Sequence, residues 1–370
     1  MIEENMTKKL RVGILFGGRS GEHEVSLLSA ASILRAIDRQ RFDVVPIGIN
    51  KSGHWLTAGA AQRLLEASVP PLSVALAQPG VAALDSHAAL ESQKLDVVFP
   101  VLHGTFGEDG TMQGLFELAG IAYVGSGVLG SSAGMDKDVM KRLFTHAKLP
   151  IVKHVTLLRA AWEAAPRKAI AQVEAALKYP VFVKPANLGS SVGISKAHNR
   201  NELGPALTEA AKFDRKLVIE QGVGGKKSKA RELEVAVLGN DAPQASVVGE
   251  IIPGKEFYDY EDKYLAEGSV PIIPAKLTKA QTKQIQLMAV AAFRACDLAG
   301  LARVDFLMEP DGKRRIFLNE VNTLPGFTSI SMYPKLWQAT GVCYKDLITR
   351  LIELALERHA EKSRTIYTRE

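Results

Sequence analysis

Two apolar runs separated by a turn constrain the fold of this 370-residue chain more than any other segment. The runs extend from Val304 to Met308 and from Ile316 to Val321. Between them lies Glu309-Pro310-Asp311-Gly312, a sequence that favours a tight turn. This pattern predicts two adjacent antiparallel strands, the first of them buried in a sheet.

Three side chains with oxygen donors lie on these two strands. Glu320 and Asn322 are two residues apart, so the period of a strand points both to one face, where Asp305 of the neighbouring strand can join them. Oxygen donors without a nearby His or Cys suit Mg²⁺ whose coordination is completed by water and phosphate oxygens. The alternative is that the two carboxylates form ion pairs with arginines on a solvated face. The arginines close enough in sequence to do so are Arg303, Arg314 and Arg315.

Composition indicates a folded protein of more than one domain. Hydrophobic residues make up 46% and charged residues 23% of the chain, and its length suggests two or three domains. The N-terminal residues include acidic ones and only a short apolar run before Gly17-Gly18, so we expect no signal peptide, no membrane span and a cytoplasmic location. Cys296 and Cys343 lack metal-site spacing, which predicts reduced thiols and no zinc.

The net charge of +6 would permit nucleic-acid binding, but the basic residues are scattered. The one cluster, Lys226-Lys227-Ser228-Lys229, follows two glycines and has no interleaved aromatic residues that could stack on bases. We therefore expect a solvated loop there and no nucleic-acid partner. The charge also fits an enzyme whose pocket binds phosphates and carboxylates.

Strand and helix patterns divide the chain into three expected domains. The first has the strand–helix alternation of a doubly wound α/β domain, and the other two have the mixed patterns typical of α+β domains. The expected domains are residues 1–134, 135–222 and 223–370. The apolar strands expected in the first domain cover residues 10–16, 42–49 and 95–102.

Two helical stretches of the second domain have recognisable patterns. Asp136 is a suitable N-cap for a helix from Lys137 to Lys148. The stretch from Ala160 to Leu177 predicts one continuous helix. In the third domain, an amphipathic helix from Lys345 to His359 is expected to close the fold.

A glycine- and serine-rich loop follows the apolar strand that ends at Lys184. Its residues Gly189, Ser190, Ser191 and Gly193 could turn backbone N–H groups and hydroxyls toward an anion, with the lysine as a point charge for a phosphate. The Walker A pattern is absent from the chain, so this would be a different kind of phosphate site. The alternative for such a loop is an ordinary hairpin.

Polar residues also follow the apolar strands of the first domain. The stretch from Gly17 lacks the G-x-G-x-x-G fingerprint, which argues against an NAD-dependent oxidoreductase. Glu22 is placed to meet a substrate amine, although Ser20 or Glu22 could simply cap the following helix. His103 ends another strand at the edge where open α/β sheets bind ligands, although a lone histidine is usually structural.

A polar loop from Phe257 to Tyr264 contains three tyrosines among charged residues and is unsuited to a core. Such a loop predicts a lid over a ligand site. The alternative is a partly ordered surface loop.

Seven motifs in register along the chain resemble those of the D-alanine–D-alanine ligase family of the ATP-grasp superfamily. They are GGRSGEHEVS, LHGTFGEDGTMQG, GMDK, FVKPANLGSSVG, FYDYEDKY, RVDF and NEVNTLPGFTSIS. Their order and spacing match from about Leu10 to His359, which is nearly the whole chain. The resemblance implies an ATP-grasp architecture, in which a doubly wound N-terminal domain precedes two α+β domains that sandwich ATP.

Matched position by position, the resemblance implies how the nucleotide and metal are held. Lys137 and Lys184 would contact phosphates, and the loop from Gly189 to Gly193, with Ser191, would cover them. The ligands of two Mg²⁺ ions would be Asp305, Glu320 and Asn322. Mn²⁺ could substitute for Mg²⁺, and K⁺ is a further candidate activator.

The base and sugar of ATP have implied ligands as well. Glu220 would receive the adenine amino group and Glu232 the ribose hydroxyls. Between them the chain has QGVGGKKSKAR, which is longer and more basic than the family pattern leads us to expect. This departure at residues 224–230 makes the assignment of Glu232 less secure than that of the metal ligands.

The resemblance also implies sites for two D-alanines. Glu22 would bind the ammonium group of the first, assisted by His103 near its carboxylate, and Ser331 would help to hold the second. Arg303 and the backbone N–H of Gly326 would stabilise the oxyanion of a tetrahedral intermediate. The expected partners are D-alanine, ATP and a second copy of the chain in a homodimer.

The lid carries the remaining implied contacts. Lys263 would reach the γ-phosphate, and Tyr264 would tie the lid to Ser190 and Glu22. The same tyrosine argues against the nearest rival, a D-alanine–D-lactate ligase, because such enzymes tend to have Phe at this position. A non-catalytic nucleotide sensor on the same fold is a second rival, but it would be expected to lose a metal ligand, and all three are present.

Overall fold

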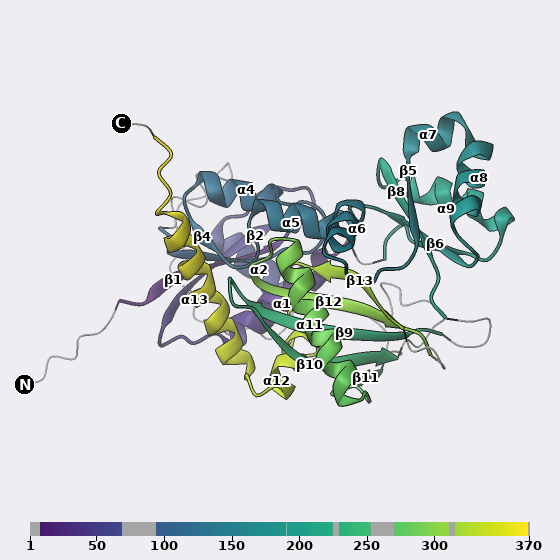
Figure 1. Ribbon diagram of the computed structural model, residues 1–370. Coiled ribbons are helices and arrows are strands. Elements are labelled where there is room, and N and C mark those ends of the chain that lie inside the picture. Colours follow the sequence, from purple (N-terminus) through teal and green to yellow (C-terminus); the bar gives the residue numbers. More distant parts are fainter. Residues whose placement is uncertain are drawn as a thin grey trace, which may run out of the picture.

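The computed structural model describes residues 8–68, 94–189, 191–224, 229–252, 270–310 and 315–368. Within these ranges the strands form three sheets, one parallel and two antiparallel. Figure 1 shows the smallest α+β unit set apart as a lobe at one end of the molecule. The expected combination of an α/β domain with two α+β units is confirmed, whereas the boundaries at residues 134 and 222 stay predictions.

The N-terminal sheet is parallel and has the order β2-β1-β3-β4. Its elements are β1 (Leu10–Gly17), α1 (His23–Ala36), β2 (Phe42–Ile49), α2 (Ala58–Ser68), β3 (Val97–Val101), α4 (Thr111–Leu118) and β4 (Ala122–Tyr123). Alternate residues of β1 enter different cores, with Ile14 and Phe16 in one and Leu15 in the other. Because both faces are covered, the strands are near-continuous apolar runs, as the sequence predicts.

Two helices lead out of this sheet. They are α5 (Val128–Met135) and α6 (Lys137–His146). Asp136 caps α6 as predicted, because its side chain accepts hydrogen bonds from the N–H groups of Asp138 and Val139. The cap fixes the direction in which Lys137, at the first turn, leaves the helix.

The small lobe is an antiparallel sheet of order β5-β8-β6-β7 covered by helices. Its elements are β5 (His154–Leu158), α7 (Arg159–Ala164), α8 (Pro166–Ala176), β6 (Val181–Pro185), β7 (Ser195–Ala197), α9 (Arg200–Ala210) and β8 (Lys216–Gln221). The prediction of one helix from Ala160 to Leu177 is wrong. Ala165 has non-helical angles and Pro166 starts a second helix at its N1 position, where the missing N–H costs nothing.

The large sheet is antiparallel, with the order β11-β10-β9-β12-β13. Its elements are β9 (Arg231–Gly239), β10 (Gln244–Ile252), β11 (Val270–Ile272), α11 (Lys279–Ala295), β12 (Gly300–Met308), β13 (Ile316–Asn322), α12 (Met332–Ala339) and α13 (Tyr344–Lys362). The predicted pairing of β12 with β13 is confirmed, and it sets Asp305 opposite Glu320 and Arg303 opposite Asn322. The oxygen donors of the sequence pattern are therefore neighbours across two strands.

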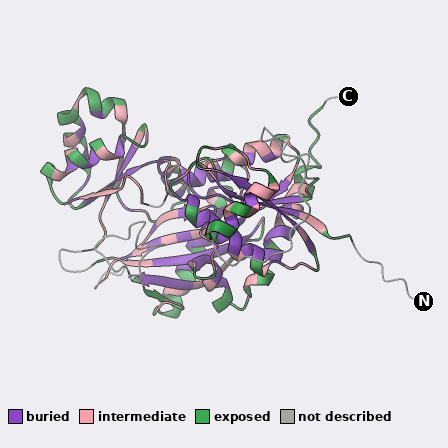
Figure 2. Cartoon of the chain, turned by 180° about the vertical axis from the view of Figure 1, so that it is seen from behind, coloured by how far each residue is buried: buried purple, intermediate pink, exposed green. Residues whose placement is uncertain are grey.

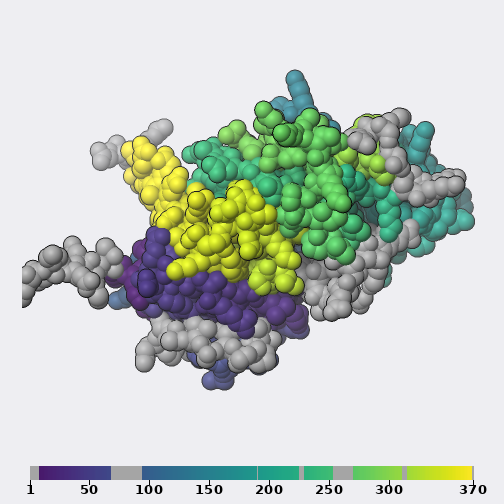
Figure 3. Space-filling view, turned by 90° about the horizontal axis from the view of Figure 1, so that it is seen from below, coloured from purple at the N-terminus to yellow at the C-terminus, as the bar shows by residue number. Residues whose placement is uncertain are grey.

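One hydrophobic core joins the N-terminal sheet to the C-terminal helices. It includes Phe16 and Phe99 from the sheet and Trp337 and Leu351 from α12 and α13. Figure 3 shows these helices, in yellow, directly against the purple N-terminal residues. The small lobe has a separate core, and Figure 2 shows its buried strands away from the other two sheets. No helix in the described ranges is long and apolar enough to cross a membrane.

Candidate active site

A pocket of about 190 Å³ opens between the small lobe and the large sheet. Its walls come from α6, β6 and β8 on one side and from β9, β12 and β13 on the other. The predicted site residues in these walls are Lys137, Lys184, Gly189, Ser191, Glu220, Glu232, Arg303, Asp305, Glu320 and Asn322. Residues that are almost 200 positions apart in sequence are thus brought to one cavity.

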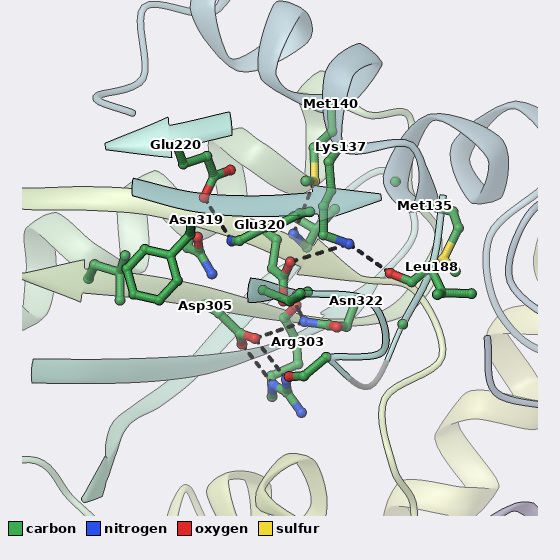
Figure 4. A pocket seen from close by; sticks show the side chains of 18 of the residues that line it. Met135, Lys137, Met140, Leu188, Glu220, Arg303, Asp305, Asn319, Glu320 and Asn322 are labelled. Atoms are coloured by element: carbon green, nitrogen blue, oxygen red, sulfur yellow. Dashed lines mark hydrogen bonds and ion pairs between the residues drawn. The ribbon is translucent and has the colours of Figure 1, made fainter. Parts of the chain in front are cut away.

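The three predicted metal ligands converge at one side of this pocket (Figure 4). Asn322 Nδ2 donates to Asp305 Oδ2 at 2.9 Å, and Glu320 Oε2 lies 3.8 Å from Lys137 Nζ. The described residues contain no group of three or more His, Cys, Asp or Glu side chains suited to a metal. Two carboxylates and an amide leave coordination positions for phosphate oxygens and water, so the donor set fits Mg²⁺ bound together with a nucleotide.

Arg303 forms a two-point ion pair with Asp305 across this site. Its Nε and one terminal nitrogen donate to the two carboxylate oxygens, each at 2.7 Å, and Nε lies 3.2 Å from Glu234. The sequence left open that Asp305 pairs with an arginine on a solvated face. Asp305 does pair with an arginine, but the pair lies within the pocket. Arg315 pairs with Glu309 instead, and Arg314 lies outside the described residues.

A chain of buried charges lines the opposite wall. Glu220 lies between Lys184 Nζ at 2.7 Å and Lys141 Nζ at 2.6 Å. Burial alone would raise the pKa of Glu220, but the two ammonium groups outweigh it and hold this pKa far below its usual range. Burial likewise works against the charge on Lys184, but Glu220 and Glu320 raise its pKa. Lys184 therefore stays positive, as a phosphate ligand must.

Lys137 has a different environment from Lys184. Its Nζ donates to the carbonyl oxygen of Leu188 at 2.8 Å, next to the glycine-rich loop. Burial lowers the pKa of Lys137, and the nearby Lys184 adds to this effect. Lys137 thus connects α6 to the loop that is predicted to cover the phosphates.

The sequence reasoning missed Lys141. The side chain is fully buried, and Nζ also donates to the carbonyl oxygen of Asn319 at 3.3 Å. It therefore links α6 both to the small lobe, through Glu220, and to β13. Its position four residues after Lys137, on the same face of a predicted helix, was a usable signal.

Replacing Lys141 with methionine is expected to destabilise the protein by about 3 kcal/mol. In the variant, the buried Glu220 keeps its pair with Lys184 but loses the one with Lys141. The expected loss in the free energy of unfolding is therefore at the lower end of the range for a broken buried ion pair. Urea denaturation measures the change. The control is Lys212→Met, which removes an exposed pair with Glu209 and should cost less than about 0.5 kcal/mol. Equal losses in the free energy of unfolding for the two substitutions would contradict the stabilising role of the buried Lys141–Glu220 pair.

Glu22 and the glycine-rich loop meet at the edge of this pocket. A Cβ atom at position 104 would lie 2.6 Å from Glu22 Oε2, and one at position 189 would lie 2.9 Å from it. Gly104 also has a φ of +79°, so no other residue fits there without strain. Glu22 is the N-cap residue of α1 but makes no side-chain cap bond, so capping does not account for its carboxylate. Ser20 accepts a hydrogen bond from the Glu22 N–H instead.

His103 is buried and has a partner on each ring nitrogen. Nδ1 lies 2.9 Å from the carbonyl oxygen of Leu324, and Nε2 lies 3.4 Å from Ser29 Oγ. Burial lowers the pKa of His103, which favours the neutral ring. Since a carbonyl can only accept, Nδ1 carries the proton and Nε2 is the acceptor. A contact with a substrate carboxylate stays a prediction.

The sequence reasoning also missed Glu108, which lines the pocket. One of its oxygens accepts from the N–H of Gly104 at 2.7 Å and the other from the N–H of Leu324 at 2.9 Å. Burial and the neighbouring Glu22 raise the pKa of Glu108 to about 8. The residue belongs to one of the motifs that carry the resemblance, which was the available signal.

Two further predicted residues, Gly326 and Ser331, do not line this pocket. Gly326 is half-buried in the segment after β13, and Ser331 is the N-cap residue of α12, with its Oγ accepting from the Thr328 N–H at 3.1 Å. Ser190, Lys263 and Tyr264 lie outside the described residues, as does the predicted lid from Phe257 to Tyr264.

The basic departure from the family pattern does not displace Glu232. Gly224 and Lys229 form an isolated antiparallel bridge, which closes the base of this connection between β8 and β9, and residues 225–228 lie outside the described ranges. Glu232 still lines the pocket. The longer connection has therefore not removed from the pocket the side chain predicted to meet the ribose.

Two antiparallel sheets that enclose lysines, oxygen donors and a glycine-rich loop, preceded by a parallel α/β domain, define an ATP-grasp protein. Residues 11–126 match the family described as D-ala D-ala ligase N-terminus, and residues 143–353 match D-ala D-ala ligase C-terminus. The chain belongs to the D-alanine–D-alanine ligase family.

Relatives of known name cover almost the whole chain. The D-alanine–D-alanine ligase A of Escherichia coli (strain K12) is 49% identical over 95% of this chain and 97% of the relative. The D-alanine–D-alanine ligase of Natranaerobius thermophilus is 50% identical over 96% of this chain and 98% of the relative. Among solved structures, the D-alanine-D-alanine ligase from Coxiella burnetii and the VanG D-Ala:D-Ser ligase from Enterococcus faecalis both have a TM-score of 0.79 at 35% identity. The first comparison covers 97% of both chains, and the second covers 94% of this chain and 100% of the other.

Proposed function

We propose that this enzyme joins two D-alanines to D-alanyl-D-alanine at the expense of ATP, for the synthesis of peptidoglycan precursors. The observation that carries the proposal is the relationship to ligases of that name over nearly the full length of the chain, and it is supported by a pocket lined by Lys137, Lys184, Asp305, Glu320 and Asn322. The cytoplasm, where ATP is available, is the proposed location. A homodimer is proposed from the family resemblance.

The first step activates a carboxyl group. A carboxylate does not condense with an amine unassisted, so one carboxylate oxygen of the first D-alanine attacks the γ-phosphorus, giving an acyl phosphate and ADP. Glu22 would hold the ammonium group of this D-alanine, while Lys137 and Lys184 hold the phosphates in line. Asp305, Glu320 and Asn322 would hold two Mg²⁺ ions, which neutralise charge on the transferring phosphoryl group; Mn²⁺ could replace them, and K⁺ is a candidate activator.

The second step forms the peptide bond. The amine of the second D-alanine attacks the acyl carbon, and the resulting oxyanion would accept from Arg303 and from the N–H of Gly326. Collapse of the tetrahedral intermediate releases phosphate. Arg303 is a suitable donor because its side chain is only 17% exposed and is already oriented by the two-point bond to Asp305.

The identity of the second substrate is the point at which related enzymes diverge. One solved neighbour is named a D-Ala:D-Ser ligase, and D-lactate is the alternative that the sequence raises. Tyr264 favours an amine nucleophile over D-lactate, by the family resemblance alone. D-alanine is therefore proposed as the preferred second substrate.

The purified chain is expected to form ADP from ATP only when both D-alanine and Mg²⁺ are present. A coupled ADP assay, with mass analysis of the products, measures this. Adding D-lactate or D-serine to D-alanine should leave D-alanyl-D-alanine as the main product. Nucleotide binding without turnover would favour the sensor alternative, and a main product with D-lactate or D-serine at its second position would reassign the second subsite.

A further inference from the structure

The backbone of Leu324 is held on both sides by the N-terminal domain. Its N–H donates to Glu108 Oε1 at 2.9 Å, and its carbonyl oxygen accepts from His103 Nδ1 at 2.9 Å. Glu108 and His103 both belong to the connection between β3 and α4, more than 200 positions earlier in the chain. The two peptide groups on either side of the Leu324 Cα are thus held by two side chains of another domain.

The carboxylate of Glu108 also fixes its own segment. Oε2 accepts from the N–H of Gly104 at 2.7 Å, while Gln113 of α4 donates to the carbonyl oxygen of Gly107 at 2.8 Å. The clamp on Leu324 therefore rests on a rigid support. The core shared by the two domains reinforces it, since Phe99 of β3 and Phe327 pack edge to face at 5.7 Å.

The clamped peptide lies in the middle of a functional segment. Asn322, a predicted metal ligand, is two residues before Leu324, and Gly326, a predicted oxyanion donor, is two residues after it. On the far side, the N–H of Phe327 donates to Ser29 Oγ of α1 at 3.3 Å. A shift of the Leu324 peptide would move the Gly326 N–H, because consecutive Cα atoms are only about 3.8 Å apart.

We propose that Glu108 is a positioning residue of the ligation reaction, which holds the backbone at Leu324 so that the Gly326 N–H can donate to the oxyanion that forms on the first D-alanine. The inference rests on the proposed function. It assigns to the N-terminal domain a part in transition-state stabilisation, in addition to holding the first substrate.

The chemistry of this position requires a carboxyl group. Two N–H donors converge on the side chain, and each carboxyl oxygen keeps a lone pair for one of them in either protonation state. Glutamine has one oxygen and one NH₂ group, so one peptide N–H would face another N–H. Aspartate has both oxygens but is one methylene shorter. Burial beside Glu22 disfavours the charge of this carboxyl group, so the two hydrogen bonds and not an ion pair account for its place here.

The test is Glu108→Gln, measured by steady-state kinetics against ATP and D-alanine and by thermal melting. We expect kcat to fall about 10- to 100-fold, as for a misaligned catalytic donor, while KM for ATP stays within threefold and the melting temperature within a few degrees. Glu117→Gln is the matched control, because Glu117 lies on α4 but pairs with Tyr123 and Lys362, away from the Leu324 segment. Its kcat should equal that of the wild type.

The possible results distinguish a failure of the positioning role from a failure of the proposed function. A kcat of Glu108→Gln within threefold of wild type would overturn the inference, and so would a parallel loss of kcat, ATP binding and melting temperature, which would indicate a purely structural role. If that variant does not fold, Glu108→Asp serves, with the same expected split between kcat and KM for ATP and the same overturning results. Absence of D-alanine-dependent ADP formation in the wild type would instead refute the proposed function.

Discussion

Replacing Arg303 with alanine is expected to lower kcat by roughly 10²- to 10³-fold, which corresponds to the loss of about 2.7–4 kcal/mol from one oxyanion donor. The guanidinium belongs to the metal-side wall of the pocket, where it is bonded to Asp305. The substitution should leave KM for ATP nearly unchanged, because the residues proposed to bind the nucleotide phosphates are lysines of the opposite wall, Lys137 and Lys184.

The ion pair with Asp305 adds a second, distinguishing expectation. Alanine at position 303 removes both hydrogen bonds to that carboxylate, so Asp305 becomes freer to bind a cation. The Mg²⁺ concentration for half-maximal rate should therefore not increase. Kinetics with varied Mg²⁺ measure this, and Arg303→Lys, which keeps the charge but not the planar fork, should show a smaller loss of kcat. A loss of ATP binding equal to the loss of kcat would refute the oxyanion role.

Replacing Glu320 with glutamine is expected to lower kcat by about 10³-fold at ordinary Mg²⁺ concentrations, since we propose that Glu320 holds a metal ion whose charge contributes several kcal/mol of transition-state stabilisation. Glu320 faces Asp305 across two strands, and its Oε2 also lies 3.8 Å from Lys137 Nζ. The half-saturating Mg²⁺ concentration should rise steeply, and high Mg²⁺ should recover part of the rate.

The control for this substitution is Glu309→Gln. Glu309 lies just after β12, and its carboxylate is held by Arg315 outside the pocket, so neither rate nor Mg²⁺ dependence should change. Magnesium titrations of the two variants measured side by side give the comparison. If the Glu320 variant kept the wild-type Mg²⁺ dependence, the metal assignment would be wrong.

Local patterns predicted much of the fold and the metal-side wall of the site. The period of a strand was enough to place Glu320 and Asn322 on one face, and the antiparallel turn was enough to bring Asp305 to them. Asp136 was found as a cap because capping depends on residues two and three positions away. The break before Pro166 was missed because the periodic pattern continues across it, and the proline at N1 was not weighed against it.

Features that depend on distant contacts were not predictable in this way. In the sequence, Lys141 looks like an ordinary lysine of a helix. Only the fold shows that its side chain contacts Glu220 and the carbonyl oxygen of Asn319. Glu108 reads as one acid in a glycine-rich turn, and only the packing of two domains gives it the Leu324 peptide as a partner. The family resemblance implied residues that contact the substrates, but it named neither Lys141 nor Glu108.

The separate cores of the molecule have a mechanical consequence. The small lobe carries its own core, whereas the N-terminal sheet and the C-terminal helices share one. The packing of the lobe can therefore be disturbed without exposing the core that joins the N-terminal sheet to the C-terminal helices. The buried pair of Lys141 with Glu220 is one contact that such a disturbance would have to break, because Glu220 belongs to β8 of the lobe and Lys141 to α6.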